Sequence, residues 1–121
     1  MGVLIDTHVL IWWVTSQPRL SKKRLEHLFS GEVVVSAASI WEISIKQSSG
    51  KLDVPQAFLD DVEALDVELL AIAPVHARAA GALPQHHGDP FDRMLIAQAM
   101  AERLPLMTDD RRIALYDIEV V

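Results

Sequence analysis

The amino-acid sequence predicts an α/β fold, a three-layer α/β/α sandwich with a central, mainly parallel sheet of four to five strands. Short apolar runs typical of strands alternate along the chain with longer segments whose apolar residues recur at helical spacing. The runs are continuous rather than alternating with polar residues, as in parallel strands that helices cover on both faces. No repeat, linker or low-complexity stretch interrupts this pattern, so residues 1–121 are expected to form a single domain.

In the first half of the chain, two strands and three helices are predicted. VLI (3–5) is a short buried strand, and THVLIWWV (7–14) is a helix. A second helix is expected over 18–31, since a proline lies at its start and a glycine at its end. Its apolar stripe consists of Leu20, Leu25, Leu28 and Phe29. VVVS (33–36) is the second strand, and ASIWEISIKQSSG is a helix that ends at Gly50.

The second half continues the alternation. The expected elements are a helix over PQAFLDDVEALD, a strand over LLAIA, a short helix over PVHARAAGAL, a loop over PQHHG, a long helix over PFDRMLIAQAMAERL, a strand over PLMT, a helical turn or two over DDRRIALY, and a closing strand over IEVV. This order of strands and helices is typical of a parallel sheet with crossover helices.

Composition narrows the possible chemistry and the compartment. The chain has no cysteine, which excludes disulfides, thiolate zinc sites and cysteine nucleophiles and favours a reducing cytoplasm. The apolar N-terminal run MGVLIDTHVLIWWV lacks a basic leader and contains Asp6 and His8. It therefore resembles neither a signal peptide nor a membrane span, and a soluble cytoplasmic protein is expected.

The formal net charge of −6 argues against a protein that binds nucleic acid through a broad basic surface. This argument does not apply to a protein that binds nucleic acid through metal ions. If several of the acids surround divalent cations, the local charge is much less negative, and the bound metal can itself meet phosphate.

Acidic residues are predicted at the edge of the sheet where ligands of α/β proteins usually bind, beyond the carboxyl ends of the strands. Asp6 directly follows the first strand, and Asp109 and Asp110 follow the PLMT strand. Asp92 lies in the first turn of the long helix, and Glu42 lies one turn into the helix after the second strand. Each of these acids also has a simpler explanation as a helix cap or, for Glu42, as half of an i,i+4 ion pair.

Two observations weaken those simpler explanations. In HGDPFDRMLIAQA, Asp89 before Pro90 already supplies the N-cap, so Asp92 is not needed for that role. Glu42 stands among bulky apolar residues, Ile40, Trp41, Ile43 and Ile45, which indicates a largely buried helix in which an acid requires a partner.

Bringing four carboxylates together would be costly. At about 5 Å and an effective dielectric constant near 20, each pair repels by roughly 3 kcal/mol. Summed over all pairs, this approaches the whole stability of a small domain, about 5–15 kcal/mol. Either the acids do not meet, or they take up protons, or they hold a cation. Oxygen ligands favour Mg²⁺ or Mn²⁺ over zinc.

Four blocks of the sequence resemble the PIN-domain nucleases, in particular the VapC-type toxins of bacterial toxin–antitoxin pairs. The blocks are LIDTHVLIWW, SAASIWEISIK, LPQHHGDPFDRMLIAQA and LMTDDRRIALYDIEVV, in the family's order and spacing. The resemblance implies a metal-dependent ribonuclease that a small antitoxin holds inactive and that commonly forms a homodimer. It also implies an acidic, metal-binding and catalytic cluster of Asp6, Glu42, Asp92 and Asp110. Asp109 could also reach the metal, but the pattern Thr-x-Asp favours Asp110 and leaves Asp109 to cap the following helix.

The implied reaction is hydrolysis of an RNA phosphodiester bond by a water molecule that one or two Mg²⁺ ions activate. No protein nucleophile is required. Single-stranded or looped RNA is the expected substrate, because an extended strand can enter a cleft at the sheet edge that a duplex cannot. Thr7 and Thr108 are candidates to orient the acidic ligands.

Three histidines lie near the acids. Adjacent residues rarely point the same way, so His86 and His87 are interpreted as part of a polar loop rather than as metal ligands. His8 could lean over the site, but a position on the helix surface is the preferred interpretation.

Arginines and tryptophans give further hypotheses. Arg93, Arg111 and Arg112 flank the acids and could contact RNA phosphates. Trp12 and Trp13 point about 100° apart on a helix. Either both pack under the neighbouring helix, or one is exposed and suits a groove for an amphipathic antitoxin segment.

Two other functions are weighed. A receiver-type phosphoacceptor domain is also an α/β module with a Mg²⁺-binding acidic pocket, but it usually has an acidic pair after its first strand and a lysine after its fifth. Here Asp6 is followed by Thr7, and no lysine follows Lys51. A catalytically silent PIN-like domain that binds RNA is the second alternative, and the presence of all four acids argues against it.

Overall fold

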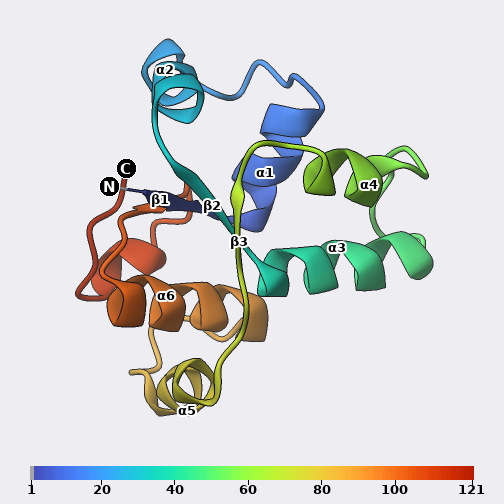
Figure 1. The fold of residues 1–121 in the computed structure, drawn as a ribbon. Coiled ribbons are helices and arrows are strands. Elements are labelled where there is room, and N and C mark those ends of the chain that lie inside the picture. Colours follow the sequence, from blue (N-terminus) through green and yellow to red (C-terminus); the bar gives the residue numbers. More distant parts are fainter. Residues whose placement is uncertain (1) are drawn as a thin grey trace.

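The computed structural model describes residues 2–121, and in them four strands form one fully parallel sheet (Figure 1). The strands are β1 (Val3–Ile5), β2 (Val33–Ser36), β3 (Glu68–Leu70) and β4 (Leu106–Met107), in the spatial order β3-β2-β1-β4. β1 pairs with both β2 and β4, so it lies inside the sheet. The predicted α/β class is confirmed. The segment IEVV forms only an isolated parallel bridge between Val120 and Leu106 rather than a fifth strand.

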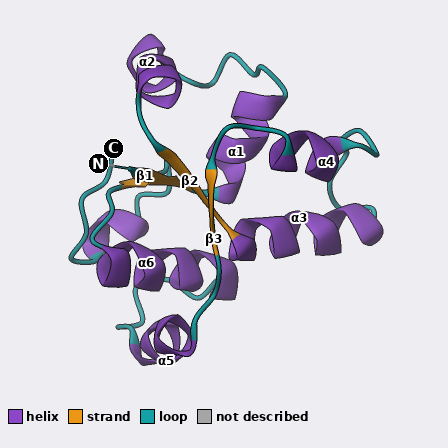
Figure 2. Ribbon diagram, in the orientation of Figure 1, coloured by secondary structure: helices purple, strands orange, loops and turns teal. Residues whose placement is uncertain are grey.

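Helices lie on both sides of this sheet (Figure 2). They are α1 (Thr7–Val14), α2 (Lys22–Ser30), α3 (Ala37–Ser48), α4 (Phe58–Glu63), α5 (Pro74–Ala82) and α6 (Pro90–Glu102), followed by a short 3-10 helix at Ile113–Leu115. The start of α2 at Lys22 rather than Pro18 has a local reason, because the Ser21 hydroxyl accepts a hydrogen bond from the Arg24 N–H and caps the helix.

The hydrophobic core has two parts, one on each face of the sheet. Val3 and Ile5 face a cluster that α1, α2, α3 and α4 cover, whereas Leu4 faces a second cluster built mainly from α5 and α6. Successive side chains of a strand point to opposite faces, so a strand buried on both faces is apolar at every position. This gives the three layers that the continuous apolar runs predicted.

Two further predictions differ from the structure. The third strand covers residues 68–70, not 69–73, and as an edge strand it leaves Leu69 half exposed. Only one neighbour supplies backbone partners, so the strand ends sooner. The prediction that α3 is largely buried is also wrong, because Trp41 and Ile45 are 58% and 44% exposed. Glu42 nevertheless lies on the buried side of that helix.

The predicted packing of the aromatic residues is partly corrected. Phe29 is 78% exposed and contacts the ring of Trp13 edge-on, so it lies outside the apolar stripe of α2. Trp12 and Trp13 are both half-buried, and Arg19 stacks over the ring of Trp12. Neither indole is freely exposed. Among residues 2–121, no helix has the length and apolar character that crossing a membrane requires.

Candidate active site

Asp6 lies at the carboxyl end of β1, where it caps α1 and also faces the end of β4. Its Oδ1 accepts a hydrogen bond of 2.8 Å from the Val9 N–H, and its Oδ2 accepts one of 2.6 Å from the Thr108 hydroxyl. Burial raises the pKa of the Asp6 carboxyl, and these two hydrogen bonds oppose that rise. Asp6 is therefore a helix cap and, at the same time, a buried acid at the edge of the sheet.

Glu42 is the buried acid of α3, only 4% exposed. The ammonium group of Lys46, one turn further along, lies 2.6 Å from its Oε2. Its other oxygen, Oε1, is buried without a hydrogen-bond partner. A buried carboxylate oxygen without a donor is costly and is a natural ligand for a cation.

Asp92 is the acid of the first turn of α6, while Asp89 caps the helix by accepting the Asp92 N–H. The pKa of the Asp92 carboxyl is raised to about 6, first by burial and then by the charge of Asp89. The charges of Glu42 and Asp6 raise it further. The carboxylates of Asp6, Glu42 and Asp92 are thus within electrostatic reach of one another.

Asp110, rather than Asp109, joins this group. One Asp110 oxygen accepts a hydrogen bond from His87 Nε2 at 2.7 Å, and the other accepts the Arg112 N–H. Burial raises the pKa of the Asp110 carboxyl, but the hydrogen bonds from His87 and Arg112 outweigh it, so the pKa is lowered. Asp109 is exposed and pairs with Arg24. The prediction that Asp109 caps the following turn is wrong, because Asp110 makes that contact.

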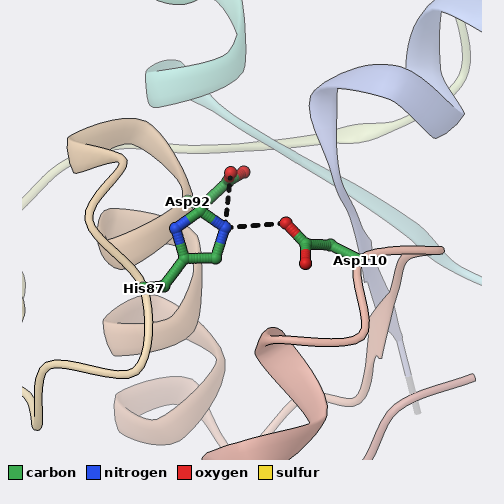
Figure 3. A group of neighbouring side chains, drawn as sticks. All are labelled: His87, Asp92 and Asp110. Carbon is green, nitrogen blue, oxygen red and sulfur yellow. Dashed lines mark hydrogen bonds and ion pairs between the residues drawn. The ribbon is translucent and has the colours of Figure 1, made fainter.

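His87 is the residue that the sequence interpretation missed. It is 3% exposed, and its Nε2 lies 3.2 Å from Asp92 and 2.7 Å from Asp110, so it stands between the two acids (Figure 3). The polar-loop interpretation holds for His86, which is exposed and contacts the Tyr116 ring, but not for His87. No signal in the sequence separated His87 from His86, because both lie in the same loop just before the start of α6.

Some of the other predicted contacts are present in the structure and others are not. Thr108 does bind an acid, Asp6, and its oxygen also accepts the Asp110 N–H. Thr7 donates instead to Ser39, and His8 is exposed on α1 as expected. The hypothesis that Arg93 contacts phosphate is contradicted, because its guanidinium is buried and donates to backbone carbonyl groups of Ala80, Gly81, Leu83, Pro84 and His87.

Each acid has a local feature that bears on its electrostatic cost. Asp6 has two hydrogen-bond donors, Glu42 has Lys46, Asp92 has a raised pKa, and Asp110 has His87 and Arg112. Local partners therefore offset part of the repulsion, and the raised pKa of Asp92 shows that part of it remains.

The donor set nevertheless fits a hard divalent cation. One carboxylate oxygen of Asp92 and one of Asp110 lie within 4.8 Å of each other, with the His87 ring between them, and Glu42 has a buried oxygen without a hydrogen-bond partner. Carboxylate oxygens suit Mg²⁺ or Mn²⁺.

An apolar cavity of about 420 Å³ has Gly88 and Arg93 in its lining, which are chain neighbours of His87 and Asp92. Trp41, Phe91, Ile72 and Met94 line it, and Trp41 and Phe91 are the chain neighbours of Glu42 and Asp92.

The model of the PIN domain family matches residues 3–119. The chain belongs to the PIN domain family. The curated protein "Ribonuclease VapC22" of Mycobacterium tuberculosis is 35% identical over 117 residues, which cover 92% of this chain and 88% of that protein. The resemblance of the four sequence blocks to PIN domains of the VapC type is thereby confirmed.

Solved structures support the same fold at lower identity. VapBC2 from Rickettsia felis, bound to a promoter DNA fragment, superposes with a TM-score of 0.76 at 14% identity and covers 100% of this PIN domain chain and 98% of that chain. DNA-bound VapBC from Salmonella typhimurium superposes with a TM-score of 0.71 at 19% identity and covers 100% of this chain and 97% of that chain. At these identities the likeness concerns the fold.

In the presence of EDTA, replacing Lys46 with methionine is expected to lower the free energy of unfolding by about 1–3 kcal/mol, because the Glu42 carboxylate is then buried without any partner. Urea denaturation in EDTA measures the change in the free energy of unfolding. Lys51→Met, at an exposed position just after α3, is the matched control and should have little effect. Equal losses in the two variants would contradict the role assigned to Lys46.

Proposed function

We propose that this protein is a Mg²⁺- or Mn²⁺-dependent endoribonuclease and the toxin of a toxin–antitoxin pair. One observation carries the proposal, namely the grouping of Asp92 and Asp110 around His87 beyond the carboxyl ends of the strands. The Thr108 hydroxyl joins Asp6 to the Asp110 backbone, and the charges of Asp6 and Glu42 raise the pKa of Asp92. We infer that these four acids, which come from four separate segments, form one site. The likeness to the ribonuclease of Mycobacterium tuberculosis supports the same reaction.

The four acids would hold the metal, and each has a device that sets its position. The Thr108 hydroxyl and the Val9 N–H fix the two oxygens of Asp6. The start of α6 fixes the backbone of Asp92, and the turn after β4 fixes Asp110. When bound, the metal supplies a water of lowered pKa and offsets negative charge on the phosphate. No side chain is needed as a nucleophile.

Single-stranded or looped RNA is the proposed substrate class. The acids lie at one edge of the sheet, and an extended strand can bring a phosphate to such an edge more easily than a duplex can. Lys46 and Arg112 pair with Glu42 and Asp110 and keep exposed surface, so both are proposed to contact phosphate groups of the RNA.

An antitoxin protein and a second copy of the chain are the proposed partners. The solved relatives include a toxin–antitoxin complex from Klebsiella pneumoniae, which matches with a TM-score of 0.69. The exposed indole of Trp41 beside an apolar cavity supports a protein-covered surface near the site. Trp41, rather than Trp12 or Trp13, is the exposed tryptophan that such a surface would use.

The receiver-type alternative is not supported by the sheet. Receiver domains have the flavodoxin-like strand order 2-1-3-4-5, whereas this sheet has the order β3-β2-β1-β4. The sheet therefore does not match the topology of a receiver domain.

Purified protein, freed of any antitoxin, is expected to cleave single-stranded RNA with Mg²⁺ or Mn²⁺ and to stop when EDTA is added. Asp6→Asn should lose cleavage by roughly two to three orders of magnitude, the size of loss found when a group that stabilises transition-state charge is removed. Denaturing gels of a labelled RNA measure the rate. Asp53→Asn, at an exposed loop position, is the matched control. Cleavage that persists in EDTA, or in Asp6→Asn, would refute the proposal.

A further inference from the structure

The hydrogen bonds of His87 determine which ring nitrogen carries its proton. Nδ1 accepts the Asp89 N–H at 3.1 Å, so this nitrogen has no proton of its own in the observed arrangement. The ring proton is then on Nε2, which points at Asp110 Oδ2 at 2.7 Å and at Asp92 Oδ2 at 3.2 Å (Figure 3). A single N–H donor therefore stands between two carboxylates.

The loop that carries His87 is fixed from two directions. The Tyr116 hydroxyl accepts the N–H groups of His86 and His87 and donates to the Pro84 carbonyl. Arg93 of α6 donates to the carbonyl groups of Pro84 and His87. The imidazole is thus held between α6, which bears Asp92, and the C-terminal segment, which bears Asp110.

We propose that His87 is a positioning residue that holds Asp92 and Asp110 at the spacing a divalent cation needs, without itself being a ligand. The two acids come from different elements and repel each other, and the shared N–H donor offsets part of that repulsion. To bind a metal, Nε2 would have to lose its proton to Nδ1, which already accepts the Asp89 N–H. This inference rests on the proposed function, since the metal it serves is the nuclease metal.

Three variants test this role. His87→Leu removes the donor, His87→Gln keeps an N–H group near the position of Nε2, and His86→Leu changes the exposed neighbouring ring. Mn²⁺ binding to the metal-free protein is measured by calorimetry. His87→Leu is expected to bind Mn²⁺ roughly 10–100-fold more weakly, the usual effect of losing a group that orients a ligand. His87→Gln should recover most of this loss, and His86→Leu should bind like the wild type.

A second measurement does not depend on metal or on activity. Nitrogen NMR of the metal-free protein should show the His87 proton on Nε2, and the carboxyl carbon signals of Asp92 and Asp110 should both shift in His87→Leu and return in His87→Gln. On addition of Mg²⁺, the Nε2 proton should remain.

Several results would overturn the positioning role. These are Mn²⁺ binding by His87→Leu at wild-type affinity, a proton found on Nδ1, or loss of the Nε2 proton when Mg²⁺ binds, which would make His87 a ligand. If the wild-type protein binds neither Mn²⁺ nor Mg²⁺, the proposed nuclease function fails, while the carboxyl signals still decide whether His87 links the two acids.

Discussion

Replacing Asp92 with asparagine is expected to remove RNA cleavage while making the metal-free protein more stable above about pH 6. Activity should fall by roughly two to three orders of magnitude, as for other groups that act on transition-state charge. Stability should move the other way, because Asp92 is a partly buried acid near Asp89, Glu42 and Asp6, and asparagine keeps its shape without its charge. A residue kept only for stability would not behave in this way.

The effect on stability should depend on pH in a defined window. The folded protein takes up a proton at Asp92 near its raised pKa of about 6, whereas the unfolded chain does so near 3.8. Between these values the folded state binds more protons, so the wild-type protein loses stability as pH rises through the window. Asp92→Asn lacks this loss. The difference between the two proteins should therefore be small near about pH 4 and should reach its full size above about pH 6.

Thermal melts in EDTA across this pH range measure the effect, with RNA cleavage in Mn²⁺ measured on the same samples. Asp53→Asn, an exposed acid to asparagine change, is the matched control and should alter neither quantity. A variant that melts below the wild type at neutral pH would show that the Asp92 carboxylate stabilises the fold, contrary to the electrostatic argument.

Replacing Arg93 with methionine is expected to destabilise the protein by about 3 kcal/mol or more, because each buried acceptor that loses its donor costs about 1–3 kcal/mol. The Arg93 guanidinium donates to carbonyl groups at the end of α5 and in the loop before α6. Methionine has a similar apolar stem but no donor, so these buried carbonyl groups would lose their partner. Urea denaturation in EDTA measures the loss.

Arg78→Met provides the control for this change, because Arg78 is an exposed arginine on α5 and should change stability by no more than about 0.5 kcal/mol. Since Arg93 also binds the His87 carbonyl, the variant should weaken Mn²⁺ binding through the loop that carries His87. A stability close to that of the wild type would mean that water replaces the guanidinium at these carbonyl groups.

The sequence predicted the parts of the site that follow from strand ends. Asp6 directly follows β1, and Asp110 lies three residues beyond the end of β4. The carboxyl ends of parallel strands meet at one edge whatever the details of packing. Asp92 and Glu42 could be proposed as site residues because each lies on an apolar helix, where a buried carboxylate is costly unless it has a partner. The boundaries of β3 and the exposure of Trp41 could not be predicted, because they depend on which strands and helices pack against these residues.

The roles of Arg93, His87 and Asp109 also lay outside what the sequence could provide. Arg93 resembles a phosphate contact in the sequence, and only the packing of α5 against α6 shows that backbone carbonyl groups surround it. Asp109 and Asp110 are adjacent and chemically alike, and the position of Arg24 on α2 separates their roles. A histidine next to a histidine gives no sign of which one turns inward.

By itself, the sequence determined the alternation of strands and helices, the parallel sheet and the positions of Asp6 and Asp110 beyond strand ends, because these follow from local apolar patterns and from the direction of strands. The tertiary structure alone decided which side chains pair with these acids and offset their charge. It brought Thr108 to Asp6 and placed His87 between Asp92 and Asp110. Hydrogen bonds between residues far apart in the chain depend on positions fixed to a fraction of an ångström, and local patterns of apolar and polar residues carry no information at that scale.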